Sequence, residues 1–136
     1  MSELLLVETF REAFADAWSM LQWWASVSFG LIAVASFARD KLNLVVVMGL
    51  SVLYSLFTAY SYLNIAALAT IALGARVELA ALSDSGSISA VGLSVLEYWE
   101  RLGHLNARIF PLCFLITFVG TLAYLWYAFR NNSKAV

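Results

Sequence analysis

Three stretches of this chain carry no formally charged residue for long enough to cross a lipid bilayer. They cover residues 17–38, 42–75 and 109–129, and contain 22, 34 and 21 residues. About 20 apolar residues in a helix span the roughly 30 Å hydrocarbon layer. Charged residues make up only 12% of the chain, whereas soluble domains average about 25%. The sequence therefore predicts an all-α integral membrane protein.

We expect one membrane domain, residues 1–136, built as a three-helix bundle. The second uncharged stretch would measure about 51 Å as a helix, which is too long for one crossing and too short for two crossings and a turn. Each helix is therefore predicted to extend beyond the bilayer on the N-terminal side. The helices are expected at about residues 3–38, 42–82 and 89–129, with membrane spans at 17–38, 42–62 and 109–129. Pro111 predicts a joint over residues 103–111.

Formal charge is distributed unevenly between the two predicted ends of the bundle. The end with the turn at residues 39–41 and the C-terminal tail has a net charge of +3, and the other end has −4. Each end holds four basic residues, but Arg39, Lys41, Arg130 and Lys134 lie close to span ends. Lys and Arg beside span ends favour the cytoplasm. We therefore predict an integral, multi-pass protein with its N-terminus outside and its C-terminus in the cytoplasm.

A polar stripe on the second span is the candidate pore lining. It consists of Ser51, Ser55, Thr58 and Tyr62, which fall within about 60° of one another at 100° per helical residue. In a symmetric oligomer such a face could line a hydrated pore. The alternative is close helix packing, because Ser51, Ser55 and Ala59 form a pattern of small residues four apart. Ser26 and Gly30 repeat that pattern in the first span.

Ionisable residues gather in two places on the predicted outer extensions. Glu8, Glu12 and Asp16 lie four residues apart and are candidates for an acidic vestibule that attracts cations. The alternative is the wet face of an amphipathic helix. The densest outer cluster consists of Glu97, Glu100, Arg101, His104 and Arg108. His104 could sense pH there, since its reference pKa is near 6.5, but a solvated or salt-bridged face is the simpler interpretation.

The sequence contains no pattern typical of an enzyme or a cofactor site. It has no glycine-rich phosphate loop, no Cys-x-x-Cys, no His-Glu-x-x-His and no nucleophile elbow. With a single His, the chain has no pair of its own to ligate a haem. We therefore expect no catalytic residues, no cofactor, no bound metal and no nucleic-acid partner. The expected partners are membrane lipids and either further copies of the chain or other membrane subunits.

These observations favour a small homo-oligomeric membrane channel or pore-forming protein that prefers cations. Three spans are too few to enclose a pathway alone, so the hypothesis requires several copies. The alternative is a non-catalytic accessory or scaffold subunit of a larger membrane protein complex. The small size and the three predicted crossings also resemble holin-like lesion formers in outline, although no motif supports that third hypothesis.

Overall fold

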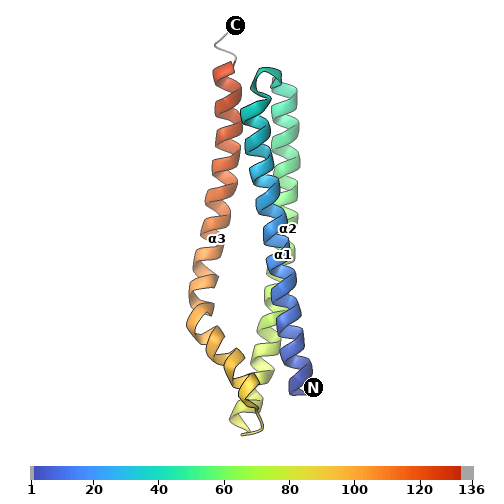
Figure 1. Ribbon diagram of the computed structural model, residues 1–136, viewed down its shortest axis with the longest axis vertical. Helices are drawn as coiled ribbons and strands as arrows, with labels where there is room; N and C mark the ends of the chain where they lie inside the picture. Colours follow the sequence, from blue (N-terminus) through green and yellow to red (C-terminus); the bar gives the residue numbers. More distant parts are fainter. Residues whose placement is uncertain (1, 133–136) are drawn as a thin grey trace. The chain divides into compact units, whose positions relative to one another are not determined.

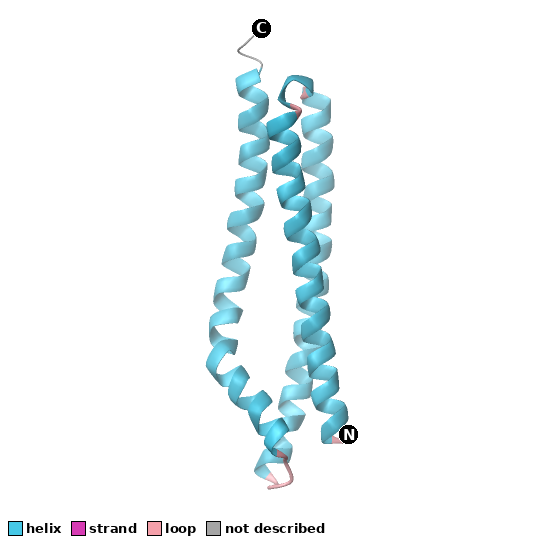
Figure 2. Cartoon of the chain, viewed as in Figure 1, coloured by secondary structure: helices cyan, strands magenta, loops and turns pink. Residues whose placement is uncertain are grey.

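The computed structural model describes the backbone of residues 2–132 and their side chains, except those of residues 102, 104–108 and 132. The elements of this part are three long α-helices and one short 3-10 helix (Figures 1 and 2). They are α1 (Glu3–Phe37), η1 (Arg39–Lys41), α2 (Leu44–Asp84) and α3 (Ala90–Asn132). The prediction of an all-helical chain is confirmed. Three helices are long and apolar enough to cross a membrane.

The helix ends follow the polar residues of the sequence. Asn43 caps α2, because its Oδ1 accepts a hydrogen bond of 2.9 Å from the Val46 backbone N–H. At its other end α2 closes with the backbone bond from Ser87 to the Leu82 carbonyl, 3.1 Å long. Gly86 adopts a φ of 69° in this turn, a left-handed conformation that glycine takes at little cost.

Pro111 lies inside α3, where the sequence predicted a joint. The backbone remains helical through residues 103–111. A proline removes one backbone donor and crowds the preceding turn. Transmembrane helices nevertheless tolerate proline when neighbouring groups satisfy the backbone atoms that it leaves unpaired. The third predicted helix is therefore a single element that reaches Asn132.

The chain divides into two compact units, each with its own core. Unit 1 contains residues Met1–Met20 and Leu63–Pro111. Its buried cluster combines α1 and α2 side chains, with partly buried α3 side chains packed against them. The buried members are Leu6, Phe10, Ala13, Ala72, Ala75 and Leu79.

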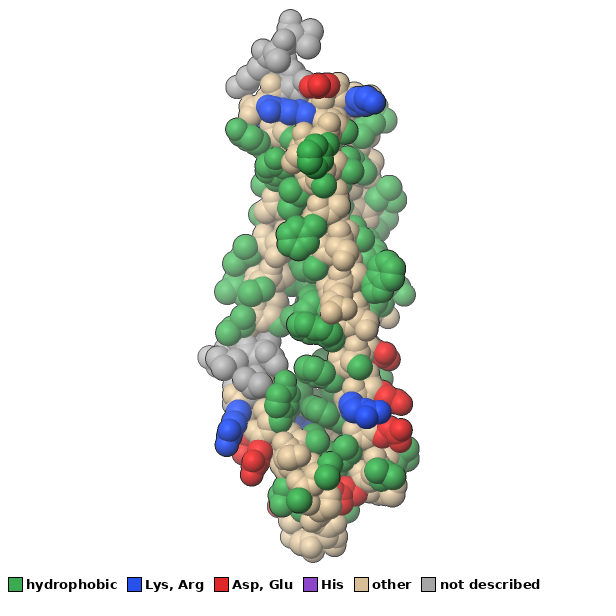
Figure 3. Space-filling model, in the orientation of Figure 1, with side chains coloured by type: hydrophobic (Ala, Val, Ile, Leu, Met, Phe, Trp, Pro, Cys, Tyr) green, Lys and Arg blue, Asp and Glu red, His purple; other side chains and the backbone are tan. Residues whose placement is uncertain are grey.

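Unit 2 contains residues Leu21–Tyr62 and Leu112–Val136. Its core draws on all three helices and on the connection between α1 and α2. The buried members are Leu31, Ala35, Leu42, Val47, Tyr54, Leu125 and Ala128. Many large apolar side chains of this unit point outward, such as Phe29 at 72% exposed, Leu53 at 66% and Tyr127 at 61% (Figure 3). Outward apolar faces suit a lipid environment.

Candidate functional site

Two polar contacts join α1 to α2 inside unit 2. Trp24 Nε1–H donates to Thr58 Oγ1 at 3.2 Å. The hydroxyls of Ser28 and Tyr54 share a hydrogen bond of 2.7 Å, and the Ser28 hydroxyl also reaches the Trp24 carbonyl. All four side chains are buried. Hydrogen bonds of this kind hold membrane helices together where apolar packing alone discriminates poorly between partners.

Aromatic side chains from α3 close the same region. Phe114 stacks on Trp24 with ring centroids 3.8 Å apart and planes at 13°. Phe118 stacks on Tyr54 at 5.5 Å. Trp24 and Tyr54, which stack on these two rings, also take part in the buried hydrogen bonds. Side chains from all three helices therefore meet in the interior of unit 2, around the two buried hydrogen bonds.

The four residues of the predicted pore lining have different surroundings in the structure. Ser51 and Ser55 are half-buried, and their hydroxyls donate to carbonyls of their own helix, those of Val47 and Ser51. Thr58 is 7% exposed and accepts the Trp24 bond. Tyr62 is 43% exposed and its ring lies 5.7 Å from that of Phe114.

Two further hydroxyls of unit 2 are buried without a hydrogen-bond partner among the described residues. They belong to Ser61 on α2 and Thr121 on α3, which are 1% and 2% exposed. A serine or threonine in a helix commonly donates to the carbonyl four residues earlier. The two hydroxyls are therefore polar atoms enclosed within unit 2.

An outward face of α1 in unit 2 carries small and polar residues, and the sequence predicted helix packing for only two of them, Ser26 and Gly30. Gln22, Ser26 and Gly30 lie four residues apart and all three are exposed. The Ser26 hydroxyl donates to the Gln22 carbonyl at 2.9 Å, and no hydrogen bond joins the Gln22 amide to another described side chain. A Cβ at Gly30 would meet no atom within 4 Å. We call these three residues the α1 face.

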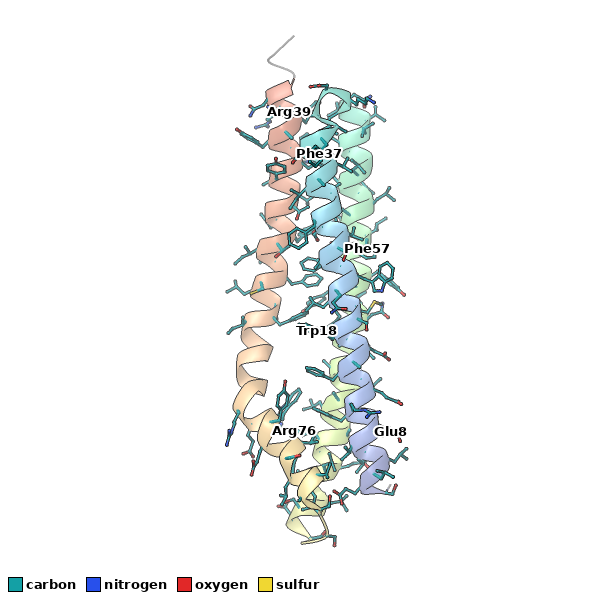
Figure 4. All side chains as sticks on the ribbon, viewed as in Figure 1. Glu8, Trp18, Phe37, Arg39, Phe57 and Arg76 are labelled. Carbon is teal, nitrogen blue, oxygen red and sulfur yellow. The ribbon has the colours of Figure 1, made fainter. Side chains whose placement is uncertain are left out.

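In unit 1 the acidic residues of the predicted vestibule point outward. Glu8, Glu12 and Asp16 are exposed on α1, and Figure 4 labels Glu8 there. The predicted cluster on α3 is described in part. Glu97, Glu100 and Arg101 are exposed, whereas the side chains of His104 and Arg108 lie outside the described residues. Within the described residues no three metal-ligating side chains come together.

Trp99 is the aromatic centre of unit 1. The Phe10 ring meets it edge-on at 5.9 Å, and the Arg76 guanidinium carbon lies 5.8 Å from the indole centroid (Figure 4). A Cβ at the buried Gly103 would approach the indole to 2.7 Å. The glycine therefore gives the indole room, and the cation–π contact ties α2 to α3.

The start of α1 contacts the start of α3 within unit 1. The Glu3 carboxylate accepts hydrogen bonds from the Ser89 backbone N–H, at 3.0 and 3.1 Å, and from its hydroxyl. The Ser89 hydroxyl lowers the pKa of Glu3 below its ordinary value of 4.5. A carboxylate at this position also complements the positive end of the α3 dipole.

These contacts between helices were not predicted from the sequence, although the residues of α2 that make them share a regular spacing. The residues buried in α2 recur at steps of three, four or seven along most of its length. They are Val47, Tyr54, Thr58 and Ser61 in unit 2, and Ile65, Ala72, Ala75 and Leu79 in unit 1. This spacing is typical of a helix that packs along one seam.

Comparison with protein-family models, curated proteins and solved structures gives no match for this chain.

Proposed function

We propose that this chain is a non-catalytic helical subunit of a larger membrane assembly, and that its α1 face packs against a helix of a neighbouring subunit. The exposed Gln22 amide within an uncharged span is the observation that carries the proposal. The assembly would hold residues 17–38, 42–62 and 109–129 in the bilayer, with the remaining helical segments outside.

The amide argues for a protein neighbour because lipid tails offer it no hydrogen-bond partner. Gln22 is five residues into the span, or about 8 Å along the helix. Interhelical hydrogen bonds of Gln and Ser contribute about 0.6–2 kcal/mol in membranes. A helix that brings a carbonyl or hydroxyl to the α1 face would therefore be favoured over lipid.

Gly30 supports the same conclusion on different grounds. Glycine in a helix costs about 1 kcal/mol relative to alanine, and no described residue of this chain requires it, since a Cβ there would meet open space. In membrane helices a glycine four residues from another small residue lets two backbones approach closely. Ser26 and Gly30 provide that pair on the exposed side of α1.

Photocrosslinking in native membranes tests this proposal. A diazirine amino acid at position 26 is expected to give an adduct with an unlike membrane protein. The same probe at Leu56, which is 64% exposed on α2, serves as the control and is expected to label lipid. Equal adduct yields from the two positions, or no protein adduct from position 26, would contradict the proposal.

The second candidate function is the homo-oligomeric channel that prefers cations. The same α1 face favours it, because an amide and a hydroxyl repeated around a ring of copies would line a hydrated path. An exposed acidic group at Glu8, Glu12 and Asp16 would attract cations at low ionic strength. Adducts from position 26 exclusively with a second copy would favour this candidate over the first.

Ion flux in proteoliposomes separates the channel from the scaffold. A channel predicts flux from the oligomer, and reduced conductance with intact assembly when Ser26 or Ser55 is replaced by Leu. Oligomeric protein that gives no flux under any ion gradient would reject the channel.

A further inference from the structure

One face of α3 in unit 2 forms an open apolar groove that ends at an arginine. Its lining residues recur at steps of three and four along the helix, so they share one side. They are Val119, Leu122, Ala123, Trp126, Tyr127 and Arg130, and the groove has a volume of about 490 Å³. That volume falls within the range of about 300–1,000 Å³ that is typical of small-ligand sites.

The walls of this groove are held by the core of unit 2. Leu122 and Trp126 pack against the buried cluster around Leu125. The Trp126 indole also meets the Phe129 ring edge-on, with centroids 6.1 Å apart. Ala123 leaves space at the floor of the groove, because its side chain is a single methyl group. The groove is therefore present before any ligand arrives.

The length of the groove matches one leaflet of a bilayer. From Val119 to Arg130 the helix rises about 16 Å, and half of the hydrocarbon layer measures about 15 Å. Arg130 follows directly after the uncharged stretch at residues 109–129. Its guanidinium therefore lies at headgroup depth when that stretch spans the membrane, and Trp126 and Tyr127 lie at the depth where aromatic residues concentrate.

The basic residues at the Arg130 end of unit 2 favour a lipid with an anionic headgroup. Arg130 shares the unit with Arg39 and Lys41 of the turn between α1 and α2, and Asp40 is the one acid beside them. Figure 4 labels Arg39 in this turn. A guanidinium binds a phosphate through two parallel hydrogen bonds, which makes arginine well suited to phosphate recognition.

We propose that this groove binds an anionic phospholipid, with one acyl chain along Val119, Leu122 and Ala123 and the phosphate on Arg130. A second apolar groove of unit 2 provides an internal comparison. It runs past Val27 and Leu53 between α1 and α2, and no charged residue lines it. Such a groove holds acyl chains without distinguishing one headgroup from another. The proposal requires the membrane span of α3 and does not depend on the proposed function.

Electron spin resonance of spin-labelled lipids tests this site in the full chain reconstituted into vesicles. Labelled phosphatidylglycerol and phosphatidylcholine report how many lipids are immobilised and which headgroup is preferred. The unaltered protein is expected to immobilise phosphatidylglycerol preferentially. Arg130→Gln should reduce that preference about fivefold, the effect of one basic residue near an anionic surface. Lys41→Gln should reduce it much less.

A second pair of variants tests the groove itself. Ala123→Leu fills the floor and is expected to remove the immobilised phosphatidylglycerol, while Thr117→Leu, exposed on α3 outside the groove, leaves it in place. Equal effects of Arg130→Gln and Lys41→Gln would mean general attraction to surface charge and would overturn the proposal. The proposal would also be overturned if the Ala123→Leu variant kept native helix content and size and immobilised the same fraction of phosphatidylglycerol as the unaltered protein.

Discussion

At the scale of single residues, the hydrogen bond between Trp24 and Thr58 is one of the two buried side-chain bonds that join α1 to α2 in unit 2. Thr58→Val preserves the shape of the side chain and removes the acceptor for the Trp24 N–H. We expect the free energy of unfolding to fall by about 0.6–2 kcal/mol, the range measured for such bonds in membranes. Unfolding in mixed micelles of increasing denaturing detergent measures the change.

Ser55→Ala is the matched control for this prediction. Its hydroxyl donates to the Ser51 carbonyl within α2 and joins no second helix. The unfolding free energy of this variant is expected to remain within about 0.5 kcal/mol of the unaltered chain, as for substitutions that break no interhelical contact. An equal loss in both variants would show that the bond to Trp24 adds nothing.

The sequence placed Thr58 correctly on its helix but could not assign its neighbour. A helical wheel gives the angle of a side chain about its own axis, and that angle grouped Thr58 with Ser55. Which helix lies next to that side of α2 depends on how the helices pack. In the structure, Trp24 of α1 lies there. Two residues of the α1 face, Ser26 and Gly30, were recognised from the spacing of small residues. That this face points outward could not be predicted, because the exposure of each residue depends on how the helices pack.

At the scale of elements, Glu3 links the first turn of α1 to the first turn of α3. Because folding lowers the pKa of Glu3, its contribution to stability is present above the unfolded pKa and is lost as pH falls through the folded pKa. Amide hydrogen exchange near Ser89, corrected for the intrinsic effect of pH, is therefore expected to accelerate below about pH 4.5. Glu3→Gln should remove most of this pH dependence, whereas Glu12→Gln should keep it.

Gly92 makes the approach of Glu3 possible. A Cβ at this position would lie 2.5 Å from Glu3 Oε1 and 2.7 Å from Ile88 Cγ1. Gly92→Ala is therefore expected to displace the carboxylate and to raise exchange near Ser89 at neutral pH. Gly74→Ala, where a Cβ would meet open space, is the control and should leave exchange unchanged. Faster exchange in both variants would point to a general effect of alanine on the helices.

The extent of each helix was predictable from the sequence for simple physical reasons. Long uncharged stretches had to be helical in lipid, and the charged turn at residues 39–41 had to end the first of them. The observed ends of α1 and α2, Phe37 and Leu44, lie within two residues of the predicted ones. The sequence did not predict that α3 is continuous, because proline at position 111 is compatible with either a break or an uninterrupted helix.

At the scale of the whole molecule, the three predicted membrane crossings would place the two connections on opposite sides. Cys113→Ala removes the one native cysteine of the chain. In that background, a cysteine introduced in place of Ser87 and one introduced in place of Lys134 are expected to react with an impermeant thiol reagent from different sides of the membrane. With the N-terminus outside, Ser87→Cys reacts in intact cells and Lys134→Cys reacts only after permeabilisation. A cysteine at Ser2 should behave like the one at Ser87. Reaction of Ser87→Cys and Lys134→Cys from the same side would exclude three crossings.

The short connection between α1 and α2 has a consequence for how the chain is made. Only six residues, 38–43, separate the last turn of α1 from the first turn of α2, and the buried Leu42 within them belongs to the core of unit 2. During synthesis the two helices are thus tethered as a hairpin, and their Trp24 and Thr58 partners can meet before α3 has left the ribosome. We therefore expect biogenesis to begin with insertion of a preassembled pair, onto which the last helix docks as a separate event.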